Sequence, residues 1–353
     1  MFRHSRTMRS MSDLTLEDIA KLAGVSRSTA SRVVNDHPNV RDDVRKRVLE
    51  VIQNTGYHPN LAARTLASQR SWMIGLVLPR SVSSFFSDPY FPRLTQGIAQ
   101  ACNQFNYSLG LFLVGTNEDE EKIYPRVSRK GFLDGILFQS GQIGEQLVDR
   151  LVNANIPLVI VGRPFQSDHL SWIDVDNVSA AYEAVNHLIQ IGYQRIGTIA
   201  ATTNSTVGLD RKEGYLKALI DHGRGVDESL IAEGDFSEAS GYSAMQQLLA
   251  AKADAVFAAS DLMAIGAIRA VQEVGLLIPH DVAFIGFDDL PVASQSEIKL
   301  TTIRQPIVQF GAKAVETLID LIENGTMPPR RIIMDTELVI RDSCGAKLKM
   351  VIA

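Results

Sequence analysis

The chain has 353 residues, of which 45% are hydrophobic and 21% are charged, as is typical of a globular protein with a large apolar core. At roughly 100–200 residues per domain, this length predicts two or three domains. Two cysteines cannot form a disulfide framework, so we expect a cytoplasmic protein, and one that binds no metal or cofactor. No apolar run reaches the ~18 residues of a membrane span, so we expect no membrane partner.

The net charge of −5 is distributed unevenly along the chain. Residues 1–71 carry 12 lysines and arginines against 7 acidic residues, whereas the remaining residues carry 23 against 33. A basic head on an acidic body predicts that only the head contacts a polyanion. We expect residues 1–12 to be a disordered tail, since they are basic and lack the apolar run of a secretory signal.

Closely spaced helix signals follow the tail. Thr15 and Asp18 predict a capping box at the start of a first helix, and Gly24 permits a tight turn after it. Ser26 predicts the cap of a second helix over Arg27–Val34. Two short helices so close together are typical of a helix-turn-helix, although an ordinary solvated hairpin has the same pattern.

The second helix has two different faces. Its inner face is apolar, whereas its outer face is rich in hydrogen-bond donors, namely Arg27, Ser28, Ser31 and Arg32. An arginine can bind guanine with two hydrogen bonds in the major groove of DNA. A third helix is predicted over Asp42–Asn54, where two aspartates suit the positive helix start and Gly56 suits the end.

From Trp72 onward, short apolar runs alternate with helical patterns, which predicts parallel sheets covered by helices on both faces. About 280 residues of this pattern is long for one doubly wound sheet, so we expect two sheets. We expect the chain to cross between them three times. The predicted crossings lie at Trp172–Asn177, Thr301–Pro306 and Gly325–Pro329.

Open α/β sheets bind ligands beyond the carboxyl ends of their strands. The polar and aromatic residues that follow the predicted strands are Asp88, Tyr90, Phe91, Arg163, Arg211, Phe236, Asp261 and Asp288. The alternatives are ion pairing for Arg211 and Asp288, plain core packing for Phe236, and loop capping for Asp88 and Asp261.

Several motifs together resemble the lactose-repressor (LacI/GalR-type) family of transcription regulators. In the head they are Thr15–Ala20, Ala23–Asn35, Gly56–Asn60 and Ala63–Leu66. In the body they include Val175–Asn177, Asp210–Tyr215, Gly286–Asp289 and Leu300–Pro306.

The resemblance implies a DNA-binding head with a hinge helix. It places Arg27, Ser28 and Arg32 where the family reads bases. Asn60 would cap the hinge helix in the minor groove, and Leu66 would wedge open a central base step. Unstacking the bases costs free energy, which is offset because the bent DNA contacts more protein. The full set of expected DNA-contacting residues is Thr15, Ser26, Arg27, Ser28, Thr29, Ser31, Arg32, Asn35, Tyr57, Asn60, Ala63, Arg64 and Leu66.

The resemblance also implies a periplasmic-binding-protein-like core of two doubly wound subdomains with an effector cleft between them. We expect the head at 13–59 and the hinge and linker at 60–71. The core would comprise an N-subdomain at 72–175 and 304–326 and a C-subdomain at 176–303 and 327–347. Arg211 and Asp288 match the family's hydroxyl-binding pair.

A mono- or oligosaccharide is the favoured effector, and a purine or another small metabolite is the alternative. The purine-responsive branch has an arginine and a threonine where this chain has Ser205 and Val207. We expect a homodimer on near-palindromic double-stranded DNA, acting as a repressor by default. A solute-binding protein for transport has no such head, and an enzyme is disfavoured because the sequence contains no metalloprotease, nucleophile-elbow, phosphate-loop or Cys-x-x-Cys motif.

Overall fold

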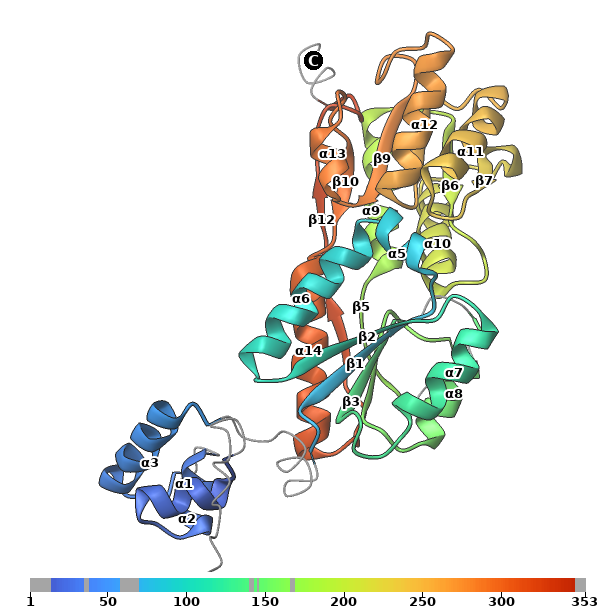
Figure 1. Cartoon of the computed structure of the whole chain (residues 1–353). Coiled ribbons are helices and arrows are strands. Elements are labelled where there is room, and N and C mark those ends of the chain that lie inside the picture. Colours follow the sequence, from blue (N-terminus) through green and yellow to red (C-terminus); the bar gives the residue numbers. More distant parts are fainter. Residues whose placement is uncertain are drawn as a thin grey trace, which may run out of the picture. The chain divides into compact units, whose positions relative to one another are not determined.

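The computed structural model describes residues 14–34, 38–57, 70–139, 143–144, 146–165 and 169–346. It divides into two compact units, Met1–Ser71 and Trp72–Ala353, which we call the head and the core (Figure 1). The expected tail at 1–12 and the expected hinge helix lie outside the described residues. No helix in the described ranges is both long and apolar enough to cross a bilayer.

The head consists of α1 (Leu16–Ala23), α2 (Arg27–Val34) and α3 (Asp42–Thr55). The predicted capping box is confirmed: Thr15 Oγ1 accepts a hydrogen bond from the Asp18 N–H at 3.3 Å, and the Asp18 carboxylate accepts one from the Thr15 N–H at 3.0 Å. Gly24 has a φ of 65°, the left-handed conformation that the turn between α1 and α2 requires. The three helices enclose a small apolar core of Ile19, Ala23, Val33, Val48 and Tyr57.

The first half of the core is a six-stranded sheet in the order β11-β5-β4-β3-β1-β2, with parallel neighbours throughout. Its strands are β1 (Met73–Leu78), β2 (Ser108–Leu113), β3 (Gly135–Gln139), β4 (Leu158–Val161), β5 (Ser171–Val175) and β11 (Arg331–Met334). The strands β1, β3 and β4 are almost wholly buried because helices cover both faces of the sheet.

Two pairs of helices flank this first sheet. Helices α6 (Tyr90–Gln104) and α14 (Ile307–Asn324) pack on one face, and α7 (Asn117–Val127) and α8 (Gln146–Asn153) pack on the other. The short α5 (Val82–Ser87) precedes α6 and starts at Ser81, whose hydroxyl accepts a hydrogen bond from the Ser84 N–H at 3.2 Å.

The second half is another six-stranded sheet, in the order β12-β10-β9-β8-β6-β7. Its strands are β6 (Ile196–Ala200), β7 (Ile231–Glu233), β8 (Ala255–Ala258), β9 (Ala283–Asp288), β10 (Thr301–Arg304) and β12 (Glu337–Val339). Only the β10–β12 pair is antiparallel among these described neighbours.

Helices cover both faces of the second sheet as well. Helices α9 (Asn177–Ile191) and α10 (Thr206–Asp221) lie on one face, and α11 (Glu238–Ala250) and α12 (Asp261–Glu273) lie on the other. A 3-10 turn, η2 (Glu228–Leu230), and the short α13 (Pro291–Gln295) complete it. The predicted fold class, a helical head followed by two doubly wound α/β sheets, is therefore confirmed.

The chain crosses between the sheets after β5, after β10 and between β11 and β12. The third crossing corrects the prediction, which placed it at Gly325–Pro329 and assigned everything from residue 327 onward to the C-subdomain. That segment instead leads from α14 into β11, which pairs with β5 in the first sheet. The glycine and prolines therefore mark a turn within the first subdomain. The chain crosses to the second sheet only after the four residues of β11.

Candidate functional site

The outer face of α2 is exposed and rich in donors. Ser26 caps the helix, since its hydroxyl accepts a hydrogen bond from the Thr29 N–H at 3.1 Å. Ala30 and Val33 point into the head core, so Arg27, Ser28 and Arg32 are left on the solvent side. Neither arginine forms an ion pair with the described part of the chain. This face carries unneutralised positive charge.

The other expected DNA-contacting residues have different environments. Thr15 and Ser26 are exposed caps, whereas Thr29 and Ser31 are half-buried. Tyr57 is only 8% exposed and packs in the head core, and burial raises the pKa of its hydroxyl. Its ring therefore supports the head from inside. The remaining expected residues, Asn35, Asn60, Ala63, Arg64 and Leu66, lie outside the described residues.

A pocket of about 710 Å³, including space open to solvent, lies between the two core subdomains. The pocket is lined by residues at the carboxyl ends of strands in both sheets. Six of the eight predicted ligand residues line it: Asp88, Tyr90, Phe91, Arg211, Phe236 and Asp288.

Arg211 is held rigidly at the pocket wall. Its Nε donates to Asn177 Oδ1 at 2.9 Å, and its Nη1 donates to the Ala259 carbonyl at 2.5 Å. The guanidinium lies 3.5 Å from the centroid of the Phe287 ring, and Nη2 lies 3.5 Å from Asp288 Oδ1. Because these partners fix the side chain before any ligand arrives, Arg211 loses little conformational entropy on binding.

Asp288 faces Arg211 from the end of β9. Burial raises the pKa of its carboxyl to about 7, even though Arg211 opposes the shift. Gln305 donates to Asp288 Oδ1 at 2.5 Å. Asp288 also has a φ of 110°, a rare conformation for a residue with a side chain and one that concentrates at functional sites. The strand end thus presents a carboxylate directly to the pocket.

Aromatic side chains provide the apolar walls of the pocket. Phe91 is buried and packs beneath the Arg80 guanidinium, which lies 4.4 Å from the ring centroid. Phe236 has a φ of 70°, so backbone strain occurs on a second pocket residue. Asp88 accepts a hydrogen bond from the Tyr90 N–H at 2.9 Å, and burial raises the pKa of its carboxyl. Asp88 therefore caps a loop and lines the pocket at once.

Asp174 is a buried carboxylate behind Arg211. It accepts hydrogen bonds from the Arg163 N–H at 2.7 Å and from Asn177 Nδ2 at 3.1 Å. Asn177 in turn accepts from Arg211, so Asp174 orients Arg211 through one intermediate side chain. Burial raises the pKa of Asp174 to about 6.

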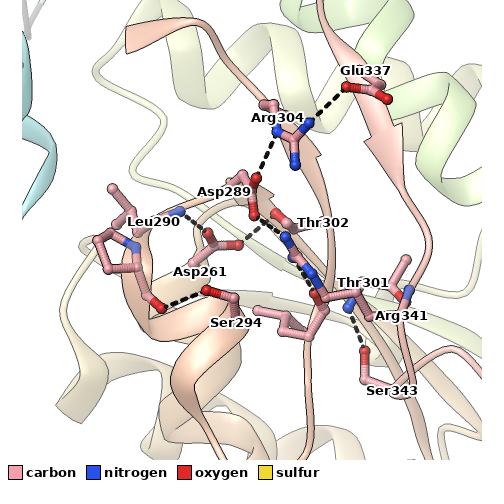
Figure 2. Close-up of polar contacts among 12 residues, drawn as sticks. Asp261, Asp289, Leu290, Ser294, Thr301, Thr302, Arg304, Glu337, Arg341 and Ser343 are labelled. Atoms are coloured by element: carbon pink, nitrogen blue, oxygen red, sulfur yellow. Dashed lines mark hydrogen bonds and ion pairs between the residues drawn. The ribbon is translucent and has the colours of Figure 1, made fainter. Parts of the chain in front are cut away.

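Two predicted ligand residues do not line the pocket. The Arg163 guanidinium turns away and binds Asp210 of α10. Asp261 is fully buried, and both of its oxygens are occupied, one by the Leu290 N–H at 2.7 Å and the other by Thr302 Oγ1 (Figure 2). Asp261 therefore joins the starts of α12 and α13 to β10. The structure thus gives both residues protein partners, and their ligand roles stay predictions.

Asp289, the residue after Asp288, links the end of β9 to Arg304 of β10 and to Arg341, which follows β12. Asp289 accepts from Arg304 Nε at 2.7 Å and from Arg341 Nη2 at 2.6 Å (Figure 2). Arg304 also donates to Glu337 of β12 at 2.9 Å. Of the two adjacent carboxylates at the end of β9, Asp288 thus lines the pocket and Asp289 binds the arginines of the neighbouring segments.

The predicted set of ligand residues omits six polar lining residues, Arg80, Gln139, Asp174, Ser205, Ser260 and Gln305. Arg80, Gln139 and Asp174 lie within or just beyond the ends of β1, β3 and β5, so the strand-end rule could have found them. Gln305 follows β10 in the same way. In the described ranges, no three or more His, Cys, Asp or Glu side chains are grouped so that they could hold a metal ion.

Two family models match the chain. Residues 15–60 match the bacterial regulatory proteins of the lacI family, and residues 185–344 match a periplasmic binding protein-like domain. The HTH-type transcriptional regulator CelR of Thermobifida fusca is 35% identical over 333 residues, 93% of this chain and 98% of CelR. The chain belongs to the LacI family.

Solved structures of LacI-family members share the whole architecture. A CelR–cellobiose complex has a TM-score of 0.75 at 34% identity, covering 94% of this chain and 99% of that one. A lac repressor dimer bound to operator and the anti-inducer ONPF has a TM-score of 0.79 at 26% identity, with the same coverage. This LacI-family chain therefore matches its relatives from the head to the end of the core.

Proposed function

We propose that this LacI-family protein is a transcription regulator that binds double-stranded DNA through its head and whose DNA affinity is controlled by a neutral sugar in the core pocket. The observation that carries the proposal is the pairing of fixed Arg211 with Asp288 on one wall of a pocket that also has aromatic walls. Together these groups offer donors and acceptors in fixed positions, and rings that suit the apolar faces of a sugar.

The DNA-binding part of the proposal rests on α2. A helix-turn-helix places its second helix in the major groove, where the N-terminal residues of that helix contact base edges. Arg27 and Ser28 occupy those positions, and Arg32 lies one turn further along the exposed face.

The charge of the pocket favours a neutral ligand. The pocket is lined by three carboxyl groups and two guanidinium groups, those of Asp88, Asp174, Asp288, Arg80 and Arg211. Arg211 already has Asn177, Ala259 and Asp288 as partners, so a phosphate or carboxylate would have to displace a buried carboxylate. Hydroxyl groups can bind such a pair without displacing it, because each hydroxyl both donates and accepts.

A purine effector is the second candidate, and two pocket residues disfavour it. Ser205 lines the pocket, but its hydroxyl caps α10 by accepting from the Gly208 N–H at 3.1 Å and donates to the Thr202 carbonyl. Val207 also lines the pocket and has no polar atom in its side chain. The relative CelR, with a similar core, has been solved with cellobiose.

A thermal-shift screen distinguishes the two effector classes. The full chain is heated with a panel containing cellobiose, other neutral mono- and disaccharides, guanine and hypoxanthine. A ligand that binds only the folded state raises the melting temperature. We expect a neutral sugar to raise it and Asp288→Asn to abolish the shift. A shift caused by nucleobases alone would overturn the sugar assignment.

We propose a homodimer on a near-palindromic site, acting in the cytoplasm, with repression as its default mode. The lac repressor relative, bound to operator as a dimer, supports this assembly. Two-fold symmetry in the protein requires a matching symmetry in the DNA. Sedimentation of the protein on a selected duplex tests it: two chains per duplex are expected, and one chain per duplex would contradict it.

A further inference from the structure

Arg163 and Asp210 connect the two core subdomains at the rim of the pocket. Arg163 follows β4 in the first sheet, and Asp210 lies on α10 against the second. The guanidinium donates to both carboxylate oxygens, from Nη2 at 2.5 Å and from Nε at 3.3 Å. Thr206, near the start of α10, donates to the Arg163 carbonyl at 2.6 Å.

A main-chain hydrogen bond joins the same rim at a second place. The Ile143 N–H, after β3, donates to the Asn204 carbonyl, after β6, at 2.6 Å. The other side of the pocket is joined by apolar packing, since Leu290 of the second subdomain is buried in the apolar core of the first. The two sides of the cleft are therefore held by different forces.

We infer that the Arg163–Asp210 pair is a releasable latch, which holds the cleft closed on its polar rim and positions Arg211 for the effector. The inference rests on the proposed function, because it assigns the pair to the control of that same pocket. Arg163 is a positioning residue in this scheme, in place of the ligand contact that the sequence predicted.

The exposure of Arg163 makes the ion pair suited to release. The Arg163 side chain is 43% exposed, whereas Asp210 is 10% exposed. An ion pair with one partner open to water is held less strongly than a fully buried pair, because water already solvates Arg163. Subdomain opening would return these charges to water at low cost. A fully buried pair could not separate so easily.

The latch is connected to the effector-binding arginine by two short routes. Asp210 directly precedes Arg211 on α10. Arg163 donates its N–H to Asp174, which also holds Asn177, and Asn177 accepts from Arg211. When the latch is closed, Asp174 holds Asn177 in the position where Asn177 accepts a hydrogen bond from Arg211. Opening it loosens the groups that fix the guanidinium.

The test measures cleft opening directly, without any effector. Cysteines replace Asn117 on α7 and Glu213 on α10, two exposed residues on different subdomains, and carry spin labels. The native Cys102 and Cys344 are buried, so they are protected from labelling. Excess unlabelled protein is added so that each measured distance lies within one chain. Double electron–electron resonance then gives the distance distribution.

Asp210→Asn and Arg163→Gln are compared with the matched control Glu238→Gln. Glu238 forms an ion pair with Arg269, whose side chain is 51% exposed and so comparable with Arg163, but both residues lie in the second subdomain. We expect each latch variant to add or enlarge a long-distance population, while the control leaves the distribution unchanged. Unchanged distributions in both latch variants would overturn the inference, as would equal widening in the control.

A second measurement follows ligand affinity, with cellobiose as the probe. If the closed form is the one that binds, the apparent dissociation constant rises as its population falls, by about 3- to 10-fold for Asp210→Asn. Equal affinities in the wild type and Asp210→Asn would count against the latch. If the wild type does not bind cellobiose, the sugar assignment is weakened, while the resonance experiment still decides on the latch.

Discussion

Arg211 and Asp288 lie side by side on one wall of the core pocket with 3.5 Å between Nη2 and Oδ1, a separation that leaves their hydrogen-bonding capacity only partly used. Arg211 comes from a helix on one face of the second sheet, and Asp288 from the end of its strand β9. Buried polar groups are expected to be satisfied. A ligand with adjacent hydroxyl groups could complete this pair.

Arg211→Lys is expected to weaken effector binding severely. Lysine cannot reproduce the contacts with Asn177, Ala259 and the ligand at once, because it lacks the planar fork of guanidinium. We expect at least ~30-fold lower affinity, about 2 kcal/mol, by titration calorimetry with the sugar that gives the largest thermal shift. The control is Arg269→Lys on the surface of the second subdomain. Comparable losses in both variants would show that the pair has no special role.

The raised pKa of Asp288 should make the stability of the protein depend on pH. Its folded pKa is raised from 3.8 to about 7, so the folded state binds more protons than the unfolded state within that window. Stability from this group is therefore lost as pH rises through the window. We expect the melting temperature of the wild type, relative to Asp288→Asn, to fall from pH 3.8 to about 7 and to change little above it. A constant difference between the two proteins would contradict the assignment.

Sugar binding should depend on pH in the opposite sense. The Asp288 carboxylate accepts hydrogen bonds from hydroxyl groups, and protonation below a pKa of about 7 removes part of that capacity. We expect the affinity of the wild type to decline as pH falls through this value. Titration calorimetry at several pH values measures it, and an affinity independent of pH would show that Asp288 does not accept from the ligand.

Arg27→Ala and Arg32→Ala should each weaken DNA binding. Loss of a base contact costs about 1–3 kcal/mol and relaxes sequence preference at one position. Loss of a phosphate contact instead lowers the salt dependence of binding by about one unit of slope. Fluorescence anisotropy at several salt concentrations separates these cases. Lys313→Ala on the core, where the lysine pairs with Glu316, serves as the control. Unchanged affinity in both arginine variants would remove α2 from the interface.

Asp289→Asn is expected to destabilise the core. The change removes the charge that pairs with Arg341, which is only 15% exposed. A buried group left without its partner costs about 1–3 kcal/mol, which a shift in the urea midpoint would record. Glu337→Gln removes an exposed partner of Arg304 in the same network, so its effect should stay below ~0.5 kcal/mol. Similar midpoints for the two variants would contradict this ranking.

Local signals predicted the fold well. The capping box at Thr15 and the turn at Gly24 are determined by neighbouring residues, and both occur as expected. The buried apolar runs likewise became strands of two sheets. The third crossing was misplaced because Arg331–Met334 is a short strand after a proline-rich turn. Its membership of the first sheet depends on pairing with β5, which is distant in sequence.

The strand-end rule located the pocket but not every side chain in it. Asp288 and Phe236 line it as predicted, and both adopt left-handed backbone that no local signal announced. Arg163 and Asp261 also follow strands, yet they turn to Asp210 and Thr302, partners more than forty positions away. A position at the edge of a sheet does not determine the direction of a side chain that has a better partner elsewhere.

We expect the core pocket to control the DNA affinity of the head. The most direct test selects a duplex from a random pool with the full chain and then titrates it by anisotropy, with and without a saturating neutral sugar identified by thermal shift. We predict a near-palindromic selected sequence and an affinity that the sugar changes in the wild type but not in Arg211→Lys or Asp288→Asn. By linkage, the duplex must change sugar affinity by the same factor. A sugar that binds the core yet leaves DNA affinity unaltered would contradict the account.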